Sequence, residues 1–480
     1  MKTLREHNGP AGKTGLRIGA VLAAVLALTA CDLDITNTNA PTVETLTENP
    51  TREVLARAAT GIFSETYTNR ATEIVFYALY GREGYNLLGN DPRETNEQIR
   101  GPQDPAGRNS GIWLGPFNSI RTINTYLEAL PQATGLSDAE RSAAEGMAKT
   151  FKAWHIQRLA VRTGAYGIPL DVDRPIDAEP APFVSFAEAM QAASTLMDEA
   201  YADLQAGGGS FPFTVPPGYT GFDTPATFAE FNRALATKLL VLRATFNGCA
   251  ACWAQANTTL SSSFVDGAGA MGTGVYFAYD AAAGEPSNPI TDPLVSNQYW
   301  VHPSIVSGAQ LQNDGVTPDQ RLVEKVADAG RSWSLDDLTG THKPVMYNGA
   351  DPATADLGAD IPWITNEELI LLRAEIRWND GNPGGAISDL NLIRTTVGNL
   401  PASGLTPTST DSEFVDELLY NRLYSLMWTQ GTRWIDARRY NRLGDLPLDR
   451  PGDQVFNQML VPADECAARE LPAPCEPLGS

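Results

Sequence analysis

The sequence predicts a mainly α-helical protein in which paired helices form a scaffold, interrupted by an insert of loops and short strands. Apolar residues recur at helical spacing over long stretches on both sides of residues 264–362, whereas 264–362 are rich in Gly, Pro, Asn and Asp. Hydrophobic residues make up 42% of the 480 residues, which is ample for a buried core. Because stacked helix pairs form one large unit, we predict a single unit over 31–480. It comprises an N-terminal helical part at 31–263, the insert at 264–362 and a C-terminal helical part at 363–480.

The first 31 residues have the organisation of a bacterial export signal. A basic segment precedes the uncharged residues 18–30, which are mostly Ala, Val and Leu. As a helix this apolar run would span about 20 Å, too short for a hydrocarbon core of about 30 Å. We therefore predict that residues 1–30 are a signal peptide that is removed. The run ends in Leu28-Thr29-Ala30-Cys31, which resembles a lipobox and implies acylation, including palmitate, of Cys31. The alternative is an ordinary signal peptide followed by a coincidental cysteine.

Charge and histidine content exclude several classes of function. The chain has 35 Lys and Arg against 57 Asp and Glu, a net charge of −22. Removing residues 1–30 leaves 31 against 56, a net charge of −25. Such acidity disfavours nucleic acid and anionic membrane surfaces as partners. Four His and no G-x-S-x-G motif disfavour a His-rich zinc site and a serine hydrolase. We predict no metal, cofactor or catalytic residue, and we expect His155 to be a core residue.

Four cysteines remain after Cys31. Cys249 and Cys252 form a C-A-A-C motif, and Cys466 and Cys475 lie near the C-terminus. An exported protein meets an oxidising compartment, so two local disulfides are expected. A redox C-x-x-C would follow a strand in a βαβ unit, but this one follows a helical pattern. A four-cysteine zinc site is the other alternative.

The N-terminal part shows helical periodicity bounded by start and stop signals. Ser137 with Glu140 resembles a capping box, Pro131 ends one helix, and Gly207-Gly208-Gly209 ends another. The predicted helices are 54–64, 117–130, 137–162, 186–204 and 225–246.

The insert and the C-terminal part follow. Residues 274–279 have the pattern of a short strand, and the G-x-G-x-x-G at 267–272 is interpreted as a loop because no helix begins after it. Helices are predicted at 366–379 and 385–397, joined by a turn at 380–384. This pair resembles a tetratricopeptide helix pair, with Ala374 and Ala386 allowing close approach. A last helix is predicted at 413–439, broken near Gly431.

Taken in order, several segments resemble the SusD/RagB family of outer-membrane nutrient-binding lipoproteins. They are the opening at 31–37 and 39–42, Asn124 in the helix after Trp113, 153–170 with its Tyr166-Gly167-Ile168-Pro169-Leu170 turn, the helix pair at 366–397, Gly431–Arg439, and Val461–Glu465. Asn421–Ser425 departs from the family by carrying fewer charges. Arg433, Asp436 and Arg439 are spaced three apart, so we expect them to form structural ion pairs.

The resemblance implies tetratricopeptide-like helix pairs that display ligand-binding loops. It also implies a lipid-anchored protein at the outer membrane, facing the cell exterior, that captures an oligosaccharide or a peptide. Its partner would be a SusC-like TonB-dependent β-barrel transporter, for which it serves as the lid, and it would not be an enzyme. The alternatives are a lipid-anchored glycoside hydrolase, with acids such as Glu367, Glu368, Asp356 or Asp360, and a helical scaffold that binds only proteins.

Sugar sites require aromatic faces beside polar side chains. Two stretches offer this combination. The first contributes Arg82, Tyr85 and Asn86, and the second contributes Tyr276, Tyr279, Tyr299 and Trp300. The alternative for each aromatic is packing in the core, which we expect for Trp113 and Trp434.

Overall fold

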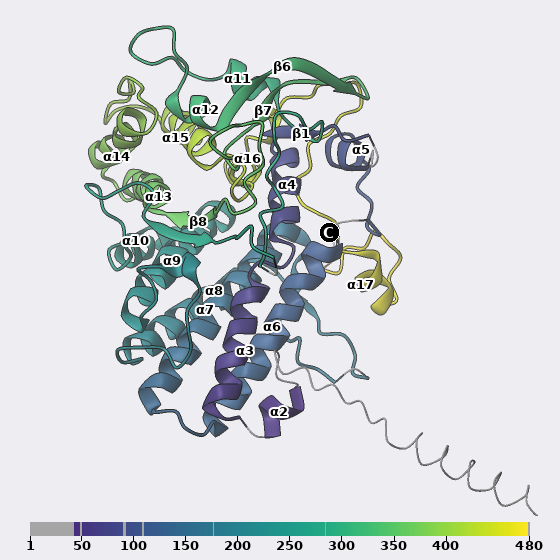
Figure 1. Cartoon of the computed structure of the whole chain (residues 1–480), viewed down its shortest axis with the longest axis vertical. Helices are drawn as coiled ribbons and strands as arrows, with labels where there is room; N and C mark the ends of the chain where they lie inside the picture. The colour runs from purple at the N-terminus through teal and green to yellow at the C-terminus, as the bar shows by residue number, and fades with distance from the viewer. Residues whose placement is uncertain are drawn as a thin grey trace, which may run out of the picture. The chain divides into compact units, whose positions relative to one another are not determined.

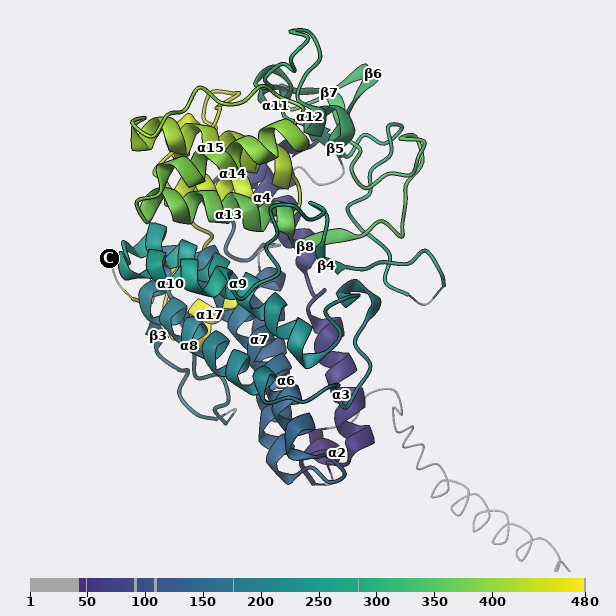
Figure 2. The ribbon, with the colours of Figure 1, turned by 90° about the vertical axis from the view of Figure 1, so that its left-hand side faces the viewer.

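Antiparallel helices packed in succession form the N-terminal part. The computed structural model describes residues 43–48, 50–89, 93–107, 110–175, 177–283 and 285–478. The predicted signal peptide, Cys31 and the family-like opening at 31–42 lie outside these residues. Helices α6 to α10 each pack on the next along the chain (Figures 1 and 2). The helices of this part are α2 (Val43–Glu48), α3 (Arg52–Glu65), α4 (Arg70–Tyr80), α5 (Arg93–Ile99), α6 (Gly111–Ala129), α7 (Asp138–Thr163), α8 (Phe186–Gln205), α9 (Pro225–Asn247) and α10 (Ala251–Leu260).

Local sequence explains where these helices begin and how closely they pack. The predicted capping box at Ser137 and Glu140 is confirmed, and Ser185 with Glu188 forms another at the start of α8. A Cβ on Gly146 would lie 2.6 Å from Cγ of Leu204, so this glycine permits the close contact of α7 with α8. One boundary was misplaced: α6 begins at Gly111, before the predicted start, and accommodates Pro116 within the helix.

The C-terminal helices between residues 366 and 439 form a second layered group, seen side by side in Figure 2. Ala374 and Ala386 are fully buried in one apolar cluster, as expected for a close helix pair. The predicted break is confirmed, because Gly431 between α15 and α16 has a φ of 67°. A Cβ at Gly431 would lie 1.9 Å from Cβ of Tyr77. The helices are α13 (Asn366–Asn379), α14 (Pro383–Thr396), α15 (Asp411–Leu426), α16 (Thr432–Arg439) and α17 (Ala463–Ala468).

The strands among the described residues pair as two-stranded antiparallel sheets. The pairs are β1 (Gly84–Asn86) with β5 (Tyr299–Val301), β2 (Ile168–Pro169) with β3 (Phe183–Val184), β4 (Gly274–Phe277) with β8 (Ile361–Thr365), and β6 (Val326–Leu335) with β7 (Leu338–Pro344). The insert also contains α11 (Pro303–Ser307) and α12 (Gln320–Lys325). Strand β4 begins where the short strand was predicted, and β8 leads directly into α13, which joins the insert to the helical scaffold.

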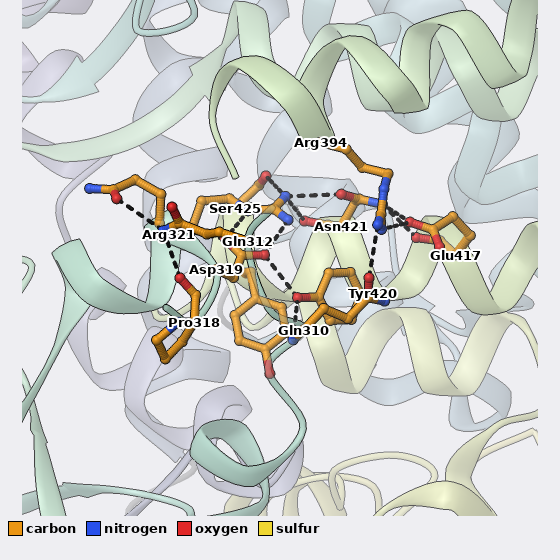
Figure 3. A network of polar contacts seen from close by, with 12 residues as sticks. Gln310, Gln312, Pro318, Asp319, Arg321, Arg394, Glu417, Tyr420, Asn421 and Ser425 are labelled. Carbon is orange, nitrogen blue, oxygen red and sulfur yellow. Dashed lines mark hydrogen bonds and ion pairs between the residues drawn. The ribbon is translucent and has the colours of Figure 1, made fainter. Parts of the chain in front are cut away.

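A polar network holds the insert against α14 and α15 (Figure 3). The guanidinium of Arg321 donates to both carboxylate oxygens of Asp319, at 2.9 and 2.6 Å, and Nη1 donates to Oδ1 of Asn421 at 3.1 Å. The hydroxyl of Tyr420 donates to Asp319 at 2.8 Å. Arg394 on α14 donates to Oε1 of Gln310 at 2.8 Å. Because Asp319 and Arg321 are fully buried, each depends on the other for its charge to be compensated.

The core contains the side chains that were predicted to be structural. His155, Trp113 and Trp434 are buried, as expected. Trp363 of β8 stacks on Phe277 of β4 with ring centroids 4.6 Å apart. The structure contains disulfides between Cys249 and Cys252 and between Cys466 and Cys475. None of the helices in the described segments combines the length and apolarity needed to cross a bilayer.

Candidate ligand-binding site

The first group of predicted ligand residues is buried, and the prediction that these side chains contact a ligand is wrong for this structure. Arg82 donates to the backbone carbonyls of Leu79, Ile99, Pro447 and Gln454. Tyr85 packs on His302, with ring centroids 5.0 Å apart. Oδ1 of Asn86 accepts from the backbone N–H of Leu88 at 3.1 Å. The physical reason is that β1 lies inside the molecule, paired with β5, so these residues satisfy one another and the backbone.

Trp300 and Tyr299 on β5 also differ from the prediction. Trp300 lies directly opposite Tyr85 across the two strands and is fully buried. Cζ of Arg331 and Nζ of Lys343 lie 5.0 and 4.7 Å from the centroid of the Trp300 ring. These cations therefore already cover the ring on which a sugar would stack. Tyr299 is 7% exposed and packs on Trp428, although it borders a surface hollow of about 430 Å³.

Tyr276 and Tyr279 are only partly buried and remain candidates. Tyr276 lines an open hollow of about 550 Å³ beside β4, which we call the β4 hollow. Tyr279 lies next to it, because its backbone N–H donates to Oδ1 of Asp360 at 3.0 Å and Asp360 also lines the hollow. The structure thus brings one pair of predicted residues to one surface. The residues lining the β4 hollow are Pro217, Gly218, Thr220, Gly221, Phe222, Glu230, Phe264, Gly272, Thr273, Gly274, Tyr276 and Asp360.

Close backbone packing builds the floor of the β4 hollow. A Cβ on Gly218 would lie 2.2 Å from the carbonyl oxygen of Tyr276, so only glycine lets this loop lie against β4. Phe222 and Phe264 pack with centroids 4.7 Å apart. The Tyr276 hydroxyl donates to the carbonyl of Gly272, which fixes its ring. The aromatic side chains of the hollow are therefore held in place before any ligand arrives.

The polar groups of the β4 hollow are neutral or acidic. Thr220, Thr273, Glu230 and Asp360 are exposed at its rim, and the lining contains no Lys or Arg. Burial, with Asp360 and Glu367 nearby, raises the pKa of Tyr276, so its phenol stays protonated at neutral pH. Aromatic faces beside hydroxyls and carboxylates suit a neutral polyhydroxylated ligand rather than an anion.

Sequence reasoning missed Trp333. It is 39% exposed, and within the described residues no other aromatic side chain exceeds about a third. Its indole Nε1 donates to the carbonyl of Leu87 at 3.1 Å, which holds the ring on the β6–β7 hairpin. The hairpin turn is Asp336-Asp337, both with positive φ. This Asp-Asp turn between two strand-like runs was the signal that could have identified an outward-facing tryptophan.

The acids considered for hydrolysis differ in their surroundings. Glu368 is buried in an ion pair with Lys238, at 2.7 Å. Asp356 and Asp360 are exposed, and Oδ1 of Asp356 accepts from the backbone N–H of Gly358. Of the expected ion pairs, Asp436 contacts Arg439 at 2.7 Å and also Arg422 at 2.8 Å. Over the described part of the chain, no three His, Cys, Asp or Glu side chains gather as a metal site would require.

Comparison with known proteins identifies the fold. No protein-family model matches the chain, and no curated protein matches it in sequence. Solved structures do match: a SusD superfamily protein from Bacteroides vulgatus has a TM-score of 0.64 at 14% identity, covering 87% of this chain and 97% of its own. The chain therefore has the fold of the SusD family, which confirms the fold that the sequence resemblance implied.

Two further structures with this fold were solved for proteins whose ligands are named. Surface glycan-binding protein A from Bacteroides thetaiotaomicron, in complex with laminarihexaose, has a TM-score of 0.65 at 13% identity, covering 87% of this chain and 98% of its own. A laminarin-binding SusD-like protein has a TM-score of 0.56 at 16% identity, covering 88% and 97%.

Proposed function

We propose that this protein binds an oligosaccharide and does not hydrolyse it. The observation that carries the proposal is a SusD fold over most of the chain with a preformed aromatic and polar hollow beside β4. In this proposal Tyr276 presents its ring to the sugar, the Asp360 carboxylate accepts hydrogen bonds at the rim, and the Thr220 hydroxyl accepts or donates them. Trp333 offers a second stacking face on the insert.

We further propose that Cys31 carries a lipid anchor at the outer membrane. There the protein would deliver its ligand as the lid of a SusC-like TonB-dependent transporter. Support comes from the lipobox at 28–31 and from the implications of the SusD resemblance. Replacing Cys31 with Ser should release the protein from the membrane fraction. Gentle extraction should recover the native protein with a large outer-membrane barrel, and extraction without one would refute the lid role.

Calorimetric titration against a glycan panel that includes laminarin tests the binding proposal. Tyr276→Ala should weaken binding about 5- to 30-fold, as expected when a stacking aromatic worth about 1–2 kcal/mol is removed. Trp333→Ala is the matched variant on the second face, and a larger loss there would move the site to the β6–β7 hairpin. Absence of binding to every glycan would refute the proposal, and release of shorter products would favour the hydrolase alternative. A peptide library run in parallel distinguishes a peptide ligand.

A further inference from the structure

A cavity of about 50 Å³ lies in the interior of the scaffold, and none of its lining residues lines the β4 hollow. Its walls come from α4, α7, α9, α13, α15 and α16. Helices α4 and α16 contact each other there, as Figure 1 shows. A buried water needs about 10–15 Å³ of such space. This cavity therefore has room for a few waters or for one small ion.

The charges around the cavity do not balance. Five basic side chains line it, Arg70, Arg158, Lys238, Arg422 and Arg439, against one acid, Glu73. Three further acids pair with these cations from outside the lining: Glu368 with Lys238, Asp436 with Arg422, and Glu375 with Arg439. Five cations thus face four carboxylates, which leaves one positive charge in excess.

The excess charge belongs to the group at α4 and α7. Glu73 accepts from Arg70 at 3.1 Å and from Arg158 at 2.6 Å, so one carboxylate serves two guanidinium groups. Burial would raise the pKa of Glu73, but the two arginines lower it, so this acid is ionised. His155 beside Arg158 adds no charge, because burial and the neighbouring arginines lower its pKa well below the usual value.

Polar atoms in the cavity wall also lack partners. Nε of Arg70, Nη1 of Arg422 and Oε1 of Gln157 are buried without a hydrogen-bond partner. Arg70 and Arg422 are more than nine-tenths buried. A buried guanidinium N–H without an acceptor is costly, and an uncompensated charge in the interior is more so. The unpartnered guanidinium N–H groups and the excess charge have the same remedy, an anionic acceptor in the cavity, whereas Oε1 of Gln157 is itself an acceptor and needs a donor.

We propose that this cavity binds one small monovalent anion, of the size of chloride or formate, between Arg70 and Arg422. The anion neutralises the excess charge and accepts hydrogen bonds from the unpartnered guanidinium atoms. The anion binds inside the scaffold between α4, which carries Arg70, and α15, which carries Arg422, so it is a structural ligand that links these two helices.

Thermal unfolding of the mature protein in sodium gluconate, titrated with sodium chloride, bromide or formate at constant ionic strength, tests the proposal. Gluconate is too large for the cavity, so only the small anions should raise Tm, saturably and by about 3 °C at a hundredfold excess over Kd. Crystals grown in bromide should give an anomalous peak beside Arg70 and Arg422. Equal Tm values in all salts and no peak would overturn the proposal and leave only water in the cavity.

Gln157→Glu tests the charge argument with a nearly isosteric change. A carboxylate placed there should substitute for the anion, raising Tm in gluconate to the wild-type value in chloride and abolishing the dependence on chloride. The control is Gln98→Glu, because Gln98 is also buried with an unpartnered Oε1 but does not line the cavity. This control should lose stability and keep the chloride dependence. A Gln157→Glu variant that kept the bromide peak would contradict the proposal.

Discussion

Glu83 is a fully buried carboxyl group whose ionisation should destabilise the protein as pH rises. Oε2 accepts the backbone N–H of Trp428 at 2.6 Å, but Oε1 has no hydrogen-bond partner. Burial raises the pKa of Glu83 from 4.5 to about 7, and the Trp428 N–H and Arg433 only partly offset this. At a pH between 4.5, the value for the unfolded chain, and about 7, the value for the folded protein, Glu83 is protonated in the folded state and ionised in the unfolded state. The contribution of Glu83 to the free energy of unfolding therefore decreases from pH 4.5 to 7 and is constant above 7.

The size of the effect follows from the pKa difference. The rise of the pKa from 4.5 to about 7, at about 1.4 kcal/mol per tenfold change in proton affinity, gives a loss of about 3 kcal/mol. With an unfolding entropy of about 0.9 kcal/mol/K for a unit of this length, the loss corresponds to about 3 °C in Tm. Glu83→Gln keeps an acceptor for the Trp428 N–H and cannot ionise. We expect its Tm relative to wild type to rise by about 3 °C between pH 4.5 and pH 8.

Calorimetry of both proteins at pH 4.5, 6 and 8 measures this difference. Glu413→Gln is the opposite control, because Glu413 is exposed in a capping box and the backbone N–H of Thr410 lowers its pKa. Its contribution is present above its unfolded pKa and is lost in acid, so this variant should lose Tm relative to wild type at pH 8 and not at low pH. A difference between Glu83→Gln and wild type that did not change with pH would refute the reasoning.

Three further changes test the packing of the fold. Gly431→Ala should lower stability by at least about 2–3 kcal/mol, because the left-handed backbone and the contact with Tyr77 both exclude a Cβ; urea unfolding measures it. Arg321→Met should cost about 3–5 kcal/mol, because Asp319 would be left buried with its charge uncompensated; urea unfolding again measures the loss. Replacing both Cys466 and Cys475 with Ser removes a disulfide that closes a loop of about ten residues and should cost about 2–3 kcal/mol; urea unfolding of this variant and of wild type measures it.

Matched variants make these outcomes specific. Gly384→Ala lies in a helix with open space around it and should be neutral or stabilising, by up to about 1 kcal/mol. Arg442→Met removes a partly exposed ion pair with Asp416 and should cost less than about 1 kcal/mol. If Gly431→Ala behaved like Gly384→Ala, or Arg321→Met like Arg442→Met, the packing that we describe would be wrong.

Helices could be predicted from the sequence because their signals are local. The capping box at Ser137 and the stop at Gly431 act within a few residues. Helical periodicity together with such start and stop signals therefore predicted most helix boundaries close to those of the structure. The ligand residues could not be predicted in the same way. Tyr85 and Trp300 read as exposed aromatics beside polar residues, yet they lie opposite each other across β1 and β5. Burial that depends on a partner more than 200 residues away leaves no trace in local composition.

The carbonyl groups that surround Arg82 have a consequence for how the chain is made. Two of them, from Pro447 and Gln454, are synthesised more than 360 residues after Arg82 itself. The N-terminal part therefore cannot complete its core until the ribosome has synthesised the C-terminal residues. Contacts of such long sequence separation also form slowly. Delayed folding agrees with the export that we propose, because an exported polypeptide crosses the secretion channel unfolded. The same arrangement predicts that a nascent chain truncated before residue 447 would stay sensitive to protease.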